Sequence, residues 1–241
     1  MEITVEPDYE SLSLAAARMV AAEIRQKPAL VLGLATGETP VGLYRELVRM
    51  YRAKEVDFSL VTTFNLDEYC DLPADHPQTF TVFMHKHLFN LVNIPHQNIN
   101  LLNSAAPDYA AECRRYDDAI RRAGGIDVQI LGIGLNGHVG LNEPDVDFGM
   151  ETRVTKLAPA TRRVHRQGFP VGVEVPRRGM TLGLRAIMNS RKLVLLASGS
   201  AKAGPLRTMI KGPVSPKVPI SILTLHPHLT VIADTAAAGN L

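Results

Sequence analysis

Several features are scarce or missing in this sequence of 241 residues, and each absence narrows the possible functions. There is no tryptophan, and the two cysteines, Cys70 and Cys113, form no C-x-x-C pair. A zinc ribbon or a thioredoxin-type site is therefore unsupported, and reduced thiols in a cytoplasmic protein are the simplest expectation. No apolar run approaches the roughly 20 residues of a membrane helix. The acidic start "MEITVEPDYE" does not resemble a secretory signal.

Acidic residues are scarce in the last part of the chain. Residues 1–150 contain 12 Lys or Arg and 21 Asp or Glu, whereas residues 151–241 contain 14 and 3. A basic segment can bind nucleic acid, but Phe169 is the only aromatic residue after position 150 on which a base could stack. We therefore expect no nucleic-acid partner. A solvated basic face and a site for a small anionic substrate remain open.

Short apolar runs without alternation recur along the chain, as in strands buried on both faces. They cover residues 3–5, 29–35, 60–66, 99–102, 126–134, 192–198, 220–225 and 229–233. Helical patterns lie between them, over 8–27, 40–51, 80–92 and the segment after Pro107. This alternation predicts one α/β domain, residues 1–241, with a mostly parallel, Rossmann-like sheet covered by helices on both faces. Ligands of such folds bind where strands end, at their carboxyl edge.

The first candidate loop is "LATGETP", residues 34–40. Thr39 is a candidate N-cap, with Pro40 at the first helical position. Backbone N–H groups at a helix start can bind an anion, and Thr36 and Thr39 could add hydroxyl donors. Glu38 would have to point away from such a site. The alternative is a well-capped turn without a ligand.

The second candidate loop is "FNLDEYCDLP", residues 64–73. Asp67 and Glu68 follow an apolar strand, and a carboxylate at that edge is well placed to abstract a proton. The alternative is a solvated pair of acids that opens a loop.

The third candidate loop, "LGIGLNGHVGLNEP", contains the pattern G-x-G-x-x-G from Gly132. A dinucleotide turn must open into a helix, which the glycines and Pro144 prevent here. We therefore expect no dinucleotide cofactor. His138 and Glu143 instead form a pair suited to moving protons near neutral pH, with glycines that let backbone approach a ligand. The alternative is a histidine that is merely exposed.

The fourth candidate loop, "ASGSAKAGPL", places Lys202 in the first turn of a helix. A cation is unfavourable there unless it meets an anion, which points to a phosphate ligand rather than to an exposed surface lysine. No cluster of residues fits a metal: His85 and His87 do not share a helical face, and His226 and His228 lack nearby acids or thiols. Together the four loops suit proton transfer on a phosphorylated small molecule.

Four blocks of this sequence resemble the signature blocks of the glucosamine-6-phosphate deaminase/isomerase family. They read "LGLATGETP", "FNLDEYCDLPADHPQTF", "LGIGLNGHVGLNEP" and "SGSAKA", in the family's order, and the similarity covers nearly the whole chain. The resemblance implies the sugar-phosphate isomerase/deaminase fold and a reaction of amino-sugar metabolism, in N-acetylglucosamine catabolism. In it, glucosamine 6-phosphate and water give fructose 6-phosphate and ammonia, through aldose–ketose isomerisation and hydrolytic loss of the amino group, without a metal or cofactor.

The resemblance also implies roles for individual residues. Asp67 would move the proton from C2 to C1, His138 would open the sugar ring between O1 and O5, and Glu143 would orient that histidine. Asn136 occupies a position that is Asp in some members, and as an amide it can orient the imidazole but cannot share its charge. The residues that would hold the phosphate are Thr36, Gly37, Thr39 and Lys202, with Arg166 as a candidate in "TRRVHRQGF".

Other functions stay open beside this one. The stretch "VPRRGMTLGLRAIMNSRKLVLL" resembles the galactosamine-6-phosphate branch, and a sugar-phosphate sensor without chemistry or a 6-phosphogluconolactonase-like hydrolase are further alternatives. The "NEP" ending argues against the lactonase. The C-terminal segment of longer, allosteric members is absent and the loop after Pro144 lacks their serines, so we expect no activation by N-acetylglucosamine 6-phosphate. A homo-oligomer is an open alternative to a monomer.

Overall fold

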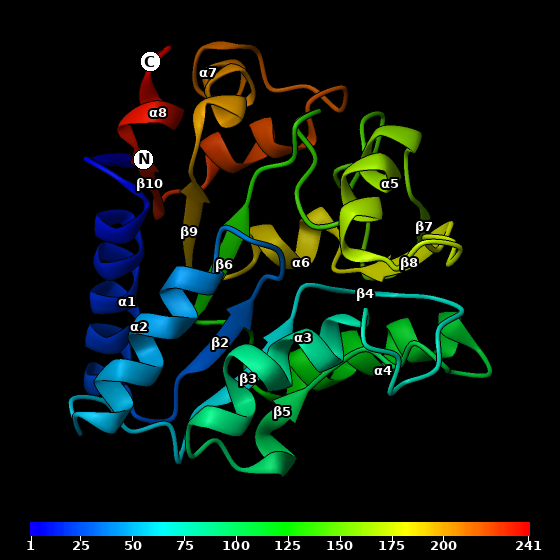
Figure 1. Ribbon diagram of the computed structural model, residues 1–241, viewed down its shortest axis with the longest axis horizontal. Coiled ribbons are helices and arrows are strands. Elements are labelled where there is room, and N and C mark those ends of the chain that lie inside the picture. Colours follow the sequence, from blue (N-terminus) through cyan, green and yellow to red (C-terminus); the bar gives the residue numbers. More distant parts are fainter.

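A computed structural model describes residues 1–241, and its main feature is a seven-stranded sheet (Figure 1). The strand order is β1-β10-β9-β6-β2-β3-β5, and every neighbouring pair is parallel. The strands are β1 (Glu2–Glu6), β2 (Val31–Leu34), β3 (Thr62–Asn65), β5 (Ile99–Asn100), β6 (Val128–Gly132), β9 (Lys192–Ala197) and β10 (Leu229–Asp234). Five of the eight apolar runs named above supply the inner strands of the sheet, and residues 3–5 and 99–102 supply its two edge strands, β1 and β5.

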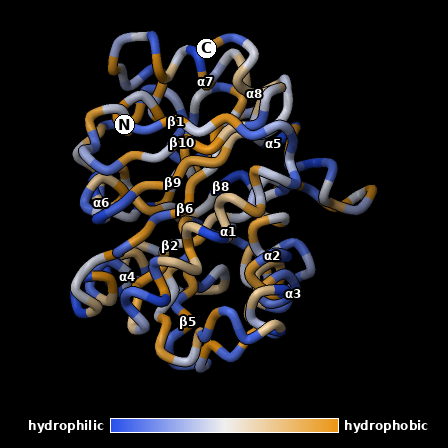
Figure 2. The backbone as a smooth tube through the Cα atoms, turned by 90° about the vertical axis from the view of Figure 1, so that its left-hand side faces the viewer, coloured by the Kyte–Doolittle hydropathy of each residue, from blue (hydrophilic) through white to orange (hydrophobic).

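Helices cover both faces of this sheet, as the sequence predicts (Figure 2). One face carries α1 (Tyr9–Gln26), α2 (Val41–Arg52) and α3 (Phe80–His87), whose apolar stripes join a core of 26 buried residues. The other face carries α4 (Tyr109–Arg122), α6 (Leu184–Met188), α7 (Ala203–Lys211) and α8 (Thr235–Ala238), over a core of 29. Each fully buried leucine contributes about 1.5–3 kcal/mol of hydrophobic stabilisation, so these two layers fix the sheet.

A second, three-stranded antiparallel sheet lies beside the large one. Its order is β4-β8-β7, formed by β4 (Asp67–Tyr69), β8 (Arg178–Thr181) and β7 (Arg153–Lys156). The short helix α5 (Pro159–His165) lies next to it in Figure 1. A small apolar cluster of Tyr69, Leu141, Leu157, Phe169 and Val175 holds this part together. These strands read DEY, RVTK and RGMT, so none of them carries the unbroken apolar run that would reveal it in the sequence.

One sequence-based assignment and one helix boundary are wrong. The run 220–225 is not a strand but part of the 3-10 helix η5 (Pro219–Leu225), because Pro219 has a fixed helical φ and no N–H for a strand ladder. The helix expected over 80–92 ends at His87, where Leu88 leaves the helical region with φ −142°. A separate 3-10 turn, η1 (Phe89–Leu91), follows it.

The four candidate loops follow four neighbouring strands. β9, β6, β2 and β3 lie side by side in that order, and their carboxyl ends meet at one edge of the sheet. The loops at 198–202, 133–144, 35–40 and 66–69 therefore converge, although they come from distant parts of the sequence.

Candidate active site

Asp67 lies where the chain passes from the large sheet into the small one, as the first residue of β4. Its side chain is only 6% exposed, and no protein group donates a hydrogen bond to Oδ1. Burial raises the pKa of Asp67 to about 8, and the charge of Glu68 adds to the rise. A solvated acid in a loop is therefore excluded, and this carboxyl group can exchange a proton near neutral pH.

Glu68, the next residue, is also buried but has a different environment. Its carboxylate accepts hydrogen bonds from the N–H groups of Tyr69 (2.8 Å), Phe80 (2.9 Å) and Thr81 (2.8 Å), and from the Thr81 hydroxyl (2.8 Å). Burial raises the pKa of Glu68, and these hydrogen bonds oppose the rise. Because two of the N–H donors belong to the first turn of α3, Glu68 joins β4 to the start of that helix.

His138, Asn136 and Glu143 lie together in the loop after β6, and Asn136 lies between the other two. Asn136 Oδ1 is 2.7 Å from His138 Nδ1, and Asn136 Nδ2 donates to Glu143 Oε2 at 2.8 Å. Glu143 Oε2 is 3.7 Å from His138 Nδ1, beyond a hydrogen bond. Asn136 therefore contacts the imidazole directly, and Glu143 acts through it.

The surroundings of His138 favour its neutral form. Burial lowers its pKa most, the charge of Lys202 lowers it further, and Glu143 acts in the opposite direction. The Thr161 hydroxyl lies 3.4 Å from Nδ1, and the N–H of Ala158 donates to Glu143 Oε1 at 3.2 Å. α5 and the residue before it thus complete the polar contacts of this group, and a neutral imidazole can accept and return a proton.

The glycines of this loop make room for the His138 ring and allow the turn that carries it. A Cβ at Gly134 would lie 2.3 Å from the His138 ring, so only glycine leaves room for the imidazole. Gly137 has φ +80°, a conformation that favours glycine. No helix follows β6 before α5, so the G-x-G-x-x-G pattern lacks the helix start that would bind a pyrophosphate.

A contact through the small sheet brings this loop next to Asp67. Thr181 pairs with Asp67 across the β4–β8 ladder, and its hydroxyl accepts a hydrogen bond from the N–H of Leu141 at 3.1 Å. Gly140 lies so close to Thr181 and Leu66 that its own Cβ would be 2.9 Å and 3.1 Å from their side chains. The base candidate and the histidine loop therefore form one site.

The loop of residues 35–40 offers free N–H donors. Gly37 has φ +98°, and none of the four N–H groups from Thr36 to Thr39 has an acceptor within the protein. The expected N-cap at Thr39 is wrong: Pro40 occupies the cap position with no side-chain cap, and α2 begins at Val41. Consecutive N–H groups around a left-handed glycine form a concave anion site.

Lys202 lies in η4 (Ser200–Lys202), directly before α7, rather than in the first turn of an α-helix. Its Nζ donates to the carbonyl of Ile133 at 2.7 Å, which joins the fourth loop to the third. Burial lowers the pKa of Lys202, while the charge of Glu38 raises it. Lys202 is therefore not an exposed surface lysine. Glu38 is exposed, but its charge acts on Lys202, so it does not point away from the site as expected.

Arg166 makes no polar contact with the residues of the anion site, Lys202 and residues 36–39. It is exposed, and its guanidinium donates to the carbonyl of Val173. It has no hydrogen bond or ion pair with Lys202 or with residues 36–39. Its role in phosphate binding stays a prediction.

Two further side chains of the site were missed in the sequence. The Tyr69 hydroxyl lies 2.6 Å from His165 Nδ1, and burial together with His138 lowers the pKa of His165 to about 4. Tyr69 lies two residues after Asp67 in "FNLDEYCDLP", and this position relates it to the site. His165 lies in the arginine-rich segment "TRRVHRQGF", where no local pattern distinguishes it as part of the site.

No helix of the structure combines the length and apolar character that a membrane span needs. No three His, Cys, Asp or Glu side chains are grouped as a metal site requires. Cys70 and Cys113 are both buried and free.

The chain is similar to known proteins over nearly its full length. A family model described as glucosamine-6-phosphate isomerases/6-phosphogluconolactonase matches residues 8–232. The glucosamine-6-phosphate deaminase of Thermoanaerobacter pseudethanolicus is 48% identical over 239 residues, which are 99% of this chain and 94% of the relative. Glucosamine-6-phosphate deaminase 2 of Bacillus subtilis is 49% identical over 243 residues, which are 100% of this chain and 98% of that relative.

Solved structures agree with this similarity. One described as a monomeric glucosamine-6-phosphate deaminase is 39% identical with a TM-score of 0.98, and 100% of both chains is covered. The 6-phosphogluconolactonase from Leishmania guyanensis is 19% identical with a TM-score of 0.77, covering 100% of this chain and 98% of its own. The second likeness concerns the fold alone.

Proposed function

The chain belongs to the family of glucosamine-6-phosphate isomerases and 6-phosphogluconolactonases, and from that premise we propose that it is a glucosamine-6-phosphate deaminase. The overall reaction converts glucosamine 6-phosphate and water into fructose 6-phosphate and ammonia. The observation that carries the proposal is Asp67, a buried carboxyl group without a donor at Oδ1, whose pKa of about 8 suits proton transfer at carbon.

Asp67 is the proposed base of the isomerisation. It takes the proton from C2 of the open-chain sugar and returns it to C1, while a proton of the ammonium group passes to O1, which leaves an iminium group at C2 and a hydroxyl at C1. Water adds to that iminium group and ammonia leaves, so that the product is the ketose. The ammonium group of the substrate is positive and lies next to C2, so its charge favours the ionised form of Asp67 in the complex.

His138 is the proposed group for opening the sugar ring. A neutral imidazole can accept the proton of the O1 hydroxyl and deliver it to O5. The contact of Asn136 Oδ1 with Nδ1 supports the tautomer in which Nδ1 carries the proton and Nε2 is free to accept one. Glu143 then stabilises the imidazolium form through Asn136 and through its own charge.

The loop 35–40 and Lys202 are the proposed phosphate site. The free N–H groups of residues 36–39 supply donors, Thr36 and Thr39 add hydroxyls, and Lys202 adds a positive charge. The negative charge of Glu38 weakens this site and sets a limit to its affinity.

One assay tests the proposal directly. The purified protein is incubated with glucosamine 6-phosphate and, separately, with galactosamine 6-phosphate, and ammonia and ketose phosphate are measured. We expect both products in equal amounts from glucosamine 6-phosphate. Faster reaction of the galactosamine substrate would assign the chain to that branch, and binding without ammonia release would indicate a sensor. Rapid hydrolysis of 6-phosphogluconolactone would instead indicate a lactonase.

We also propose that residues 1–241 form one domain that acts as a monomer in the cytoplasm. The family match over residues 8–232 supports one domain, and the relative of known structure that is described as monomeric favours a monomer over the homo-oligomer. Two buried free thiols are in keeping with a reducing compartment. Light scattering on the purified protein checks the oligomeric state.

A further inference from the structure

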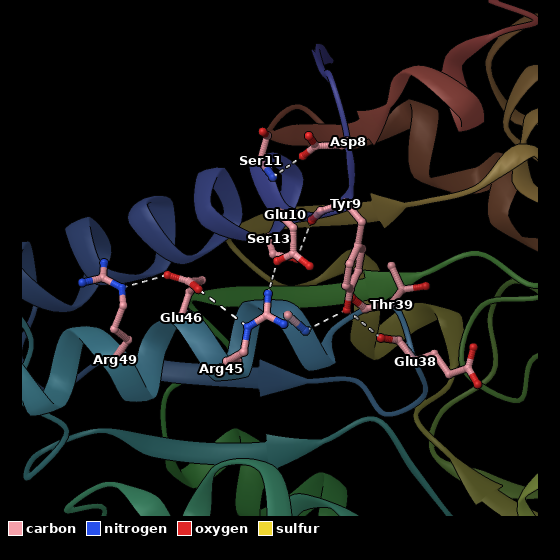
Figure 3. Close-up of polar contacts among 11 residues, drawn as sticks. Asp8, Tyr9, Glu10, Ser11, Ser13, Glu38, Thr39, Arg45, Glu46 and Arg49 are labelled. Atoms are coloured by element: carbon pink, nitrogen blue, oxygen red, sulfur yellow. Dashed lines mark hydrogen bonds and ion pairs between the residues drawn. The ribbon is translucent and has the colours of Figure 1, made fainter.

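A tyrosine outside the proposed site holds the loop that would bind the phosphate. Tyr9, the first residue of α1, reaches across to the loop before α2 (Figure 3). The single proton of its hydroxyl is shared by the carbonyls of Glu38 (2.9 Å) and Thr39 (3.1 Å), and the hydroxyl accepts from the N–H of Gly42 (2.8 Å). One hydroxyl thus contacts both the loop and the first turn of α2.

The direction of the Glu38 carbonyl decides the direction of one donor of the loop, the N–H of Thr39, whereas the Thr39 carbonyl precedes Pro40, which has no N–H. In a trans peptide the C=O and the following N–H point opposite ways, and no peptide bond of this protein is cis. When the carbonyl of Glu38 points to Tyr9, the N–H of Thr39 points away from α1. The N–H of Val41 also donates to the Glu38 carbonyl, at 3.2 Å, so Tyr9 supplies the second and shorter of the two hydrogen bonds that keep this carbonyl turned away from the anion.

The position of Tyr9 is itself fixed by packing of α1 on α2. A Cβ at Gly42 would lie 2.1 Å from Ser13 Oγ and 3.0 Å from the Tyr9 ring, so the two helices approach as closely as glycine allows. Ser13 Oγ donates to the carbonyl of Tyr9 at 2.7 Å. An ion pair between Glu10 and Arg45 also joins the helices (Figure 3).

We propose that Tyr9 is a positioning residue for phosphate binding, which acts by holding the Glu38–Thr39 peptide with its N–H toward the substrate. The proposal rests on the function proposed above, because it takes residues 36–39 as the phosphate loop. Tyr9 itself contacts no substrate. Loss of its hydroxyl therefore weakens phosphate binding and leaves the proton transfers at Asp67 and His138 intact.

The chain contains a matched control for this role. Tyr109 is the first residue of α4, as Tyr9 is of α1, and each follows an aspartate that caps its helix. The Tyr109 hydroxyl also accepts from a backbone N–H, that of Asp71 (2.9 Å), and donates to a carbonyl, that of Ser104 (2.9 Å). Tyr109→Phe removes the same chemistry from a loop that binds no phosphate.

The experiment compares the wild type, Tyr9→Phe and Tyr109→Phe. We measure kcat and KM for glucosamine 6-phosphate, the dissociation constant of inorganic phosphate by calorimetry, and the thermal midpoint. We expect Tyr9→Phe to raise KM and the phosphate dissociation constant by the same factor, about tenfold, with kcat within about twofold. We expect both variants to lower the thermal midpoint by a similar amount. Tyr109→Phe should leave KM and the phosphate dissociation constant unchanged.

Several results would overturn the inference: unchanged KM and phosphate affinity in Tyr9→Phe, a fall in kcat alone, equal effects in both variants, or no phosphate binding by the wild type. A failure of the proposed function looks different. In that case the wild type releases no ammonia, and the phosphate titrations still decide whether Tyr9 positions the loop.

Discussion

The two sides of β4 give neighbouring carboxylates opposite tasks. Asp67 and Glu68 are both buried and both lie on one three-residue strand, so their side chains point to opposite sides. Glu68 accepts four hydrogen bonds that tie β4 to α3, whereas Oδ1 of Asp67 accepts none from the protein. An ionised carboxylate with four donors is stabilised in place, and one without donors keeps a high proton affinity.

This difference shows which of two adjacent acids is free to react. Burial alone raises the pKa of both groups, so burial does not distinguish them. The number of hydrogen-bond donors to each carboxylate distinguishes them, because these donors offset the free-energy cost of removing its charge from water. The comparison leads to four predictions, which begin with the largest effect.

The strongest test replaces the free carboxylate. Asp67→Asn keeps the size of the side chain but removes the base, and we expect kcat for ammonia release to fall by about 10²–10⁴-fold. Glucosamine 6-phosphate should still bind, because the phosphate loop is untouched. Near-normal turnover would refute the role of Asp67.

The same variant should be more stable than the wild type, and more so at high pH. The pKa of Asp67 rises from 3.8 to about 8 on folding, so its stabilising contribution is complete below about pH 4 and is lost as the pH rises through about 8. Asn carries no charge to bury, so the gain should reach on the order of a few kcal/mol above that pH. Urea unfolding at about pH 5 and about pH 9 measures it. An equal gain at both values would contradict the raised pKa.

The opposite side of β4 should respond in the opposite way. Glu68→Gln turns an amide group toward the N–H donors of Phe80 and Thr81, so we expect the free energy of unfolding to fall by about 1–3 kcal/mol. The variant that remains folded should keep kcat within about tenfold, because no step is assigned to Glu68. Urea unfolding measures the loss of stability, and the rate of ammonia release measures kcat. Unchanged stability would remove the distinction between the two acids.

The smallest expected effect comes from adding a carboxylate where the structure has an amide. Asn136→Asp places a negative charge against His138 Nδ1, where Asn136 Oδ1 is now 2.7 Å away. We expect the pKa of His138 to rise, and the limb of the pH profile of kcat/KM that reports it to move up by about one unit. The isosteric variant Asn136→Leu, which cannot hydrogen-bond, serves as the control. A profile that does not move would show that Asn136 only orients the ring.

The large sheet could be predicted because its inner strands are mostly buried and every strand lies within an apolar run, although the edge strands β1 and β5 are partly exposed. The run 220–225 has the same composition but forms a 3-10 helix, since composition does not show whether a neighbouring strand is available. The small sheet could not be found for the opposite reason. Its strands β7 and β8 contain charged or polar residues, as RVTK and RGMT, and so lack an apolar run.

Within the site, the sequence identified the chemical groups but not their geometry. Asp67, His138 and Lys202 follow strand ends, and parallel topology was enough to bring them to one edge. Glu143 and Asn136 were both expected to orient His138, and the structure places Asn136 between the other two because its amide can bond to both. His165 comes from a helix that leaves the small sheet, and no local pattern relates it to Tyr69.

The pairing of β1 with β10 has a consequence for how the chain folds during synthesis. Glu2 to Glu6 pair with residues 230–234, and Thr235 donates to the carbonyl of Pro7 across 228 positions. The first strand to leave the ribosome therefore has no partner until nearly all the other strands have been made, and closing so long a loop is entropically costly. The edge of the sheet is completed last, so a nascent chain that stops before β10 leaves both β1 and β9 without a neighbour on that side.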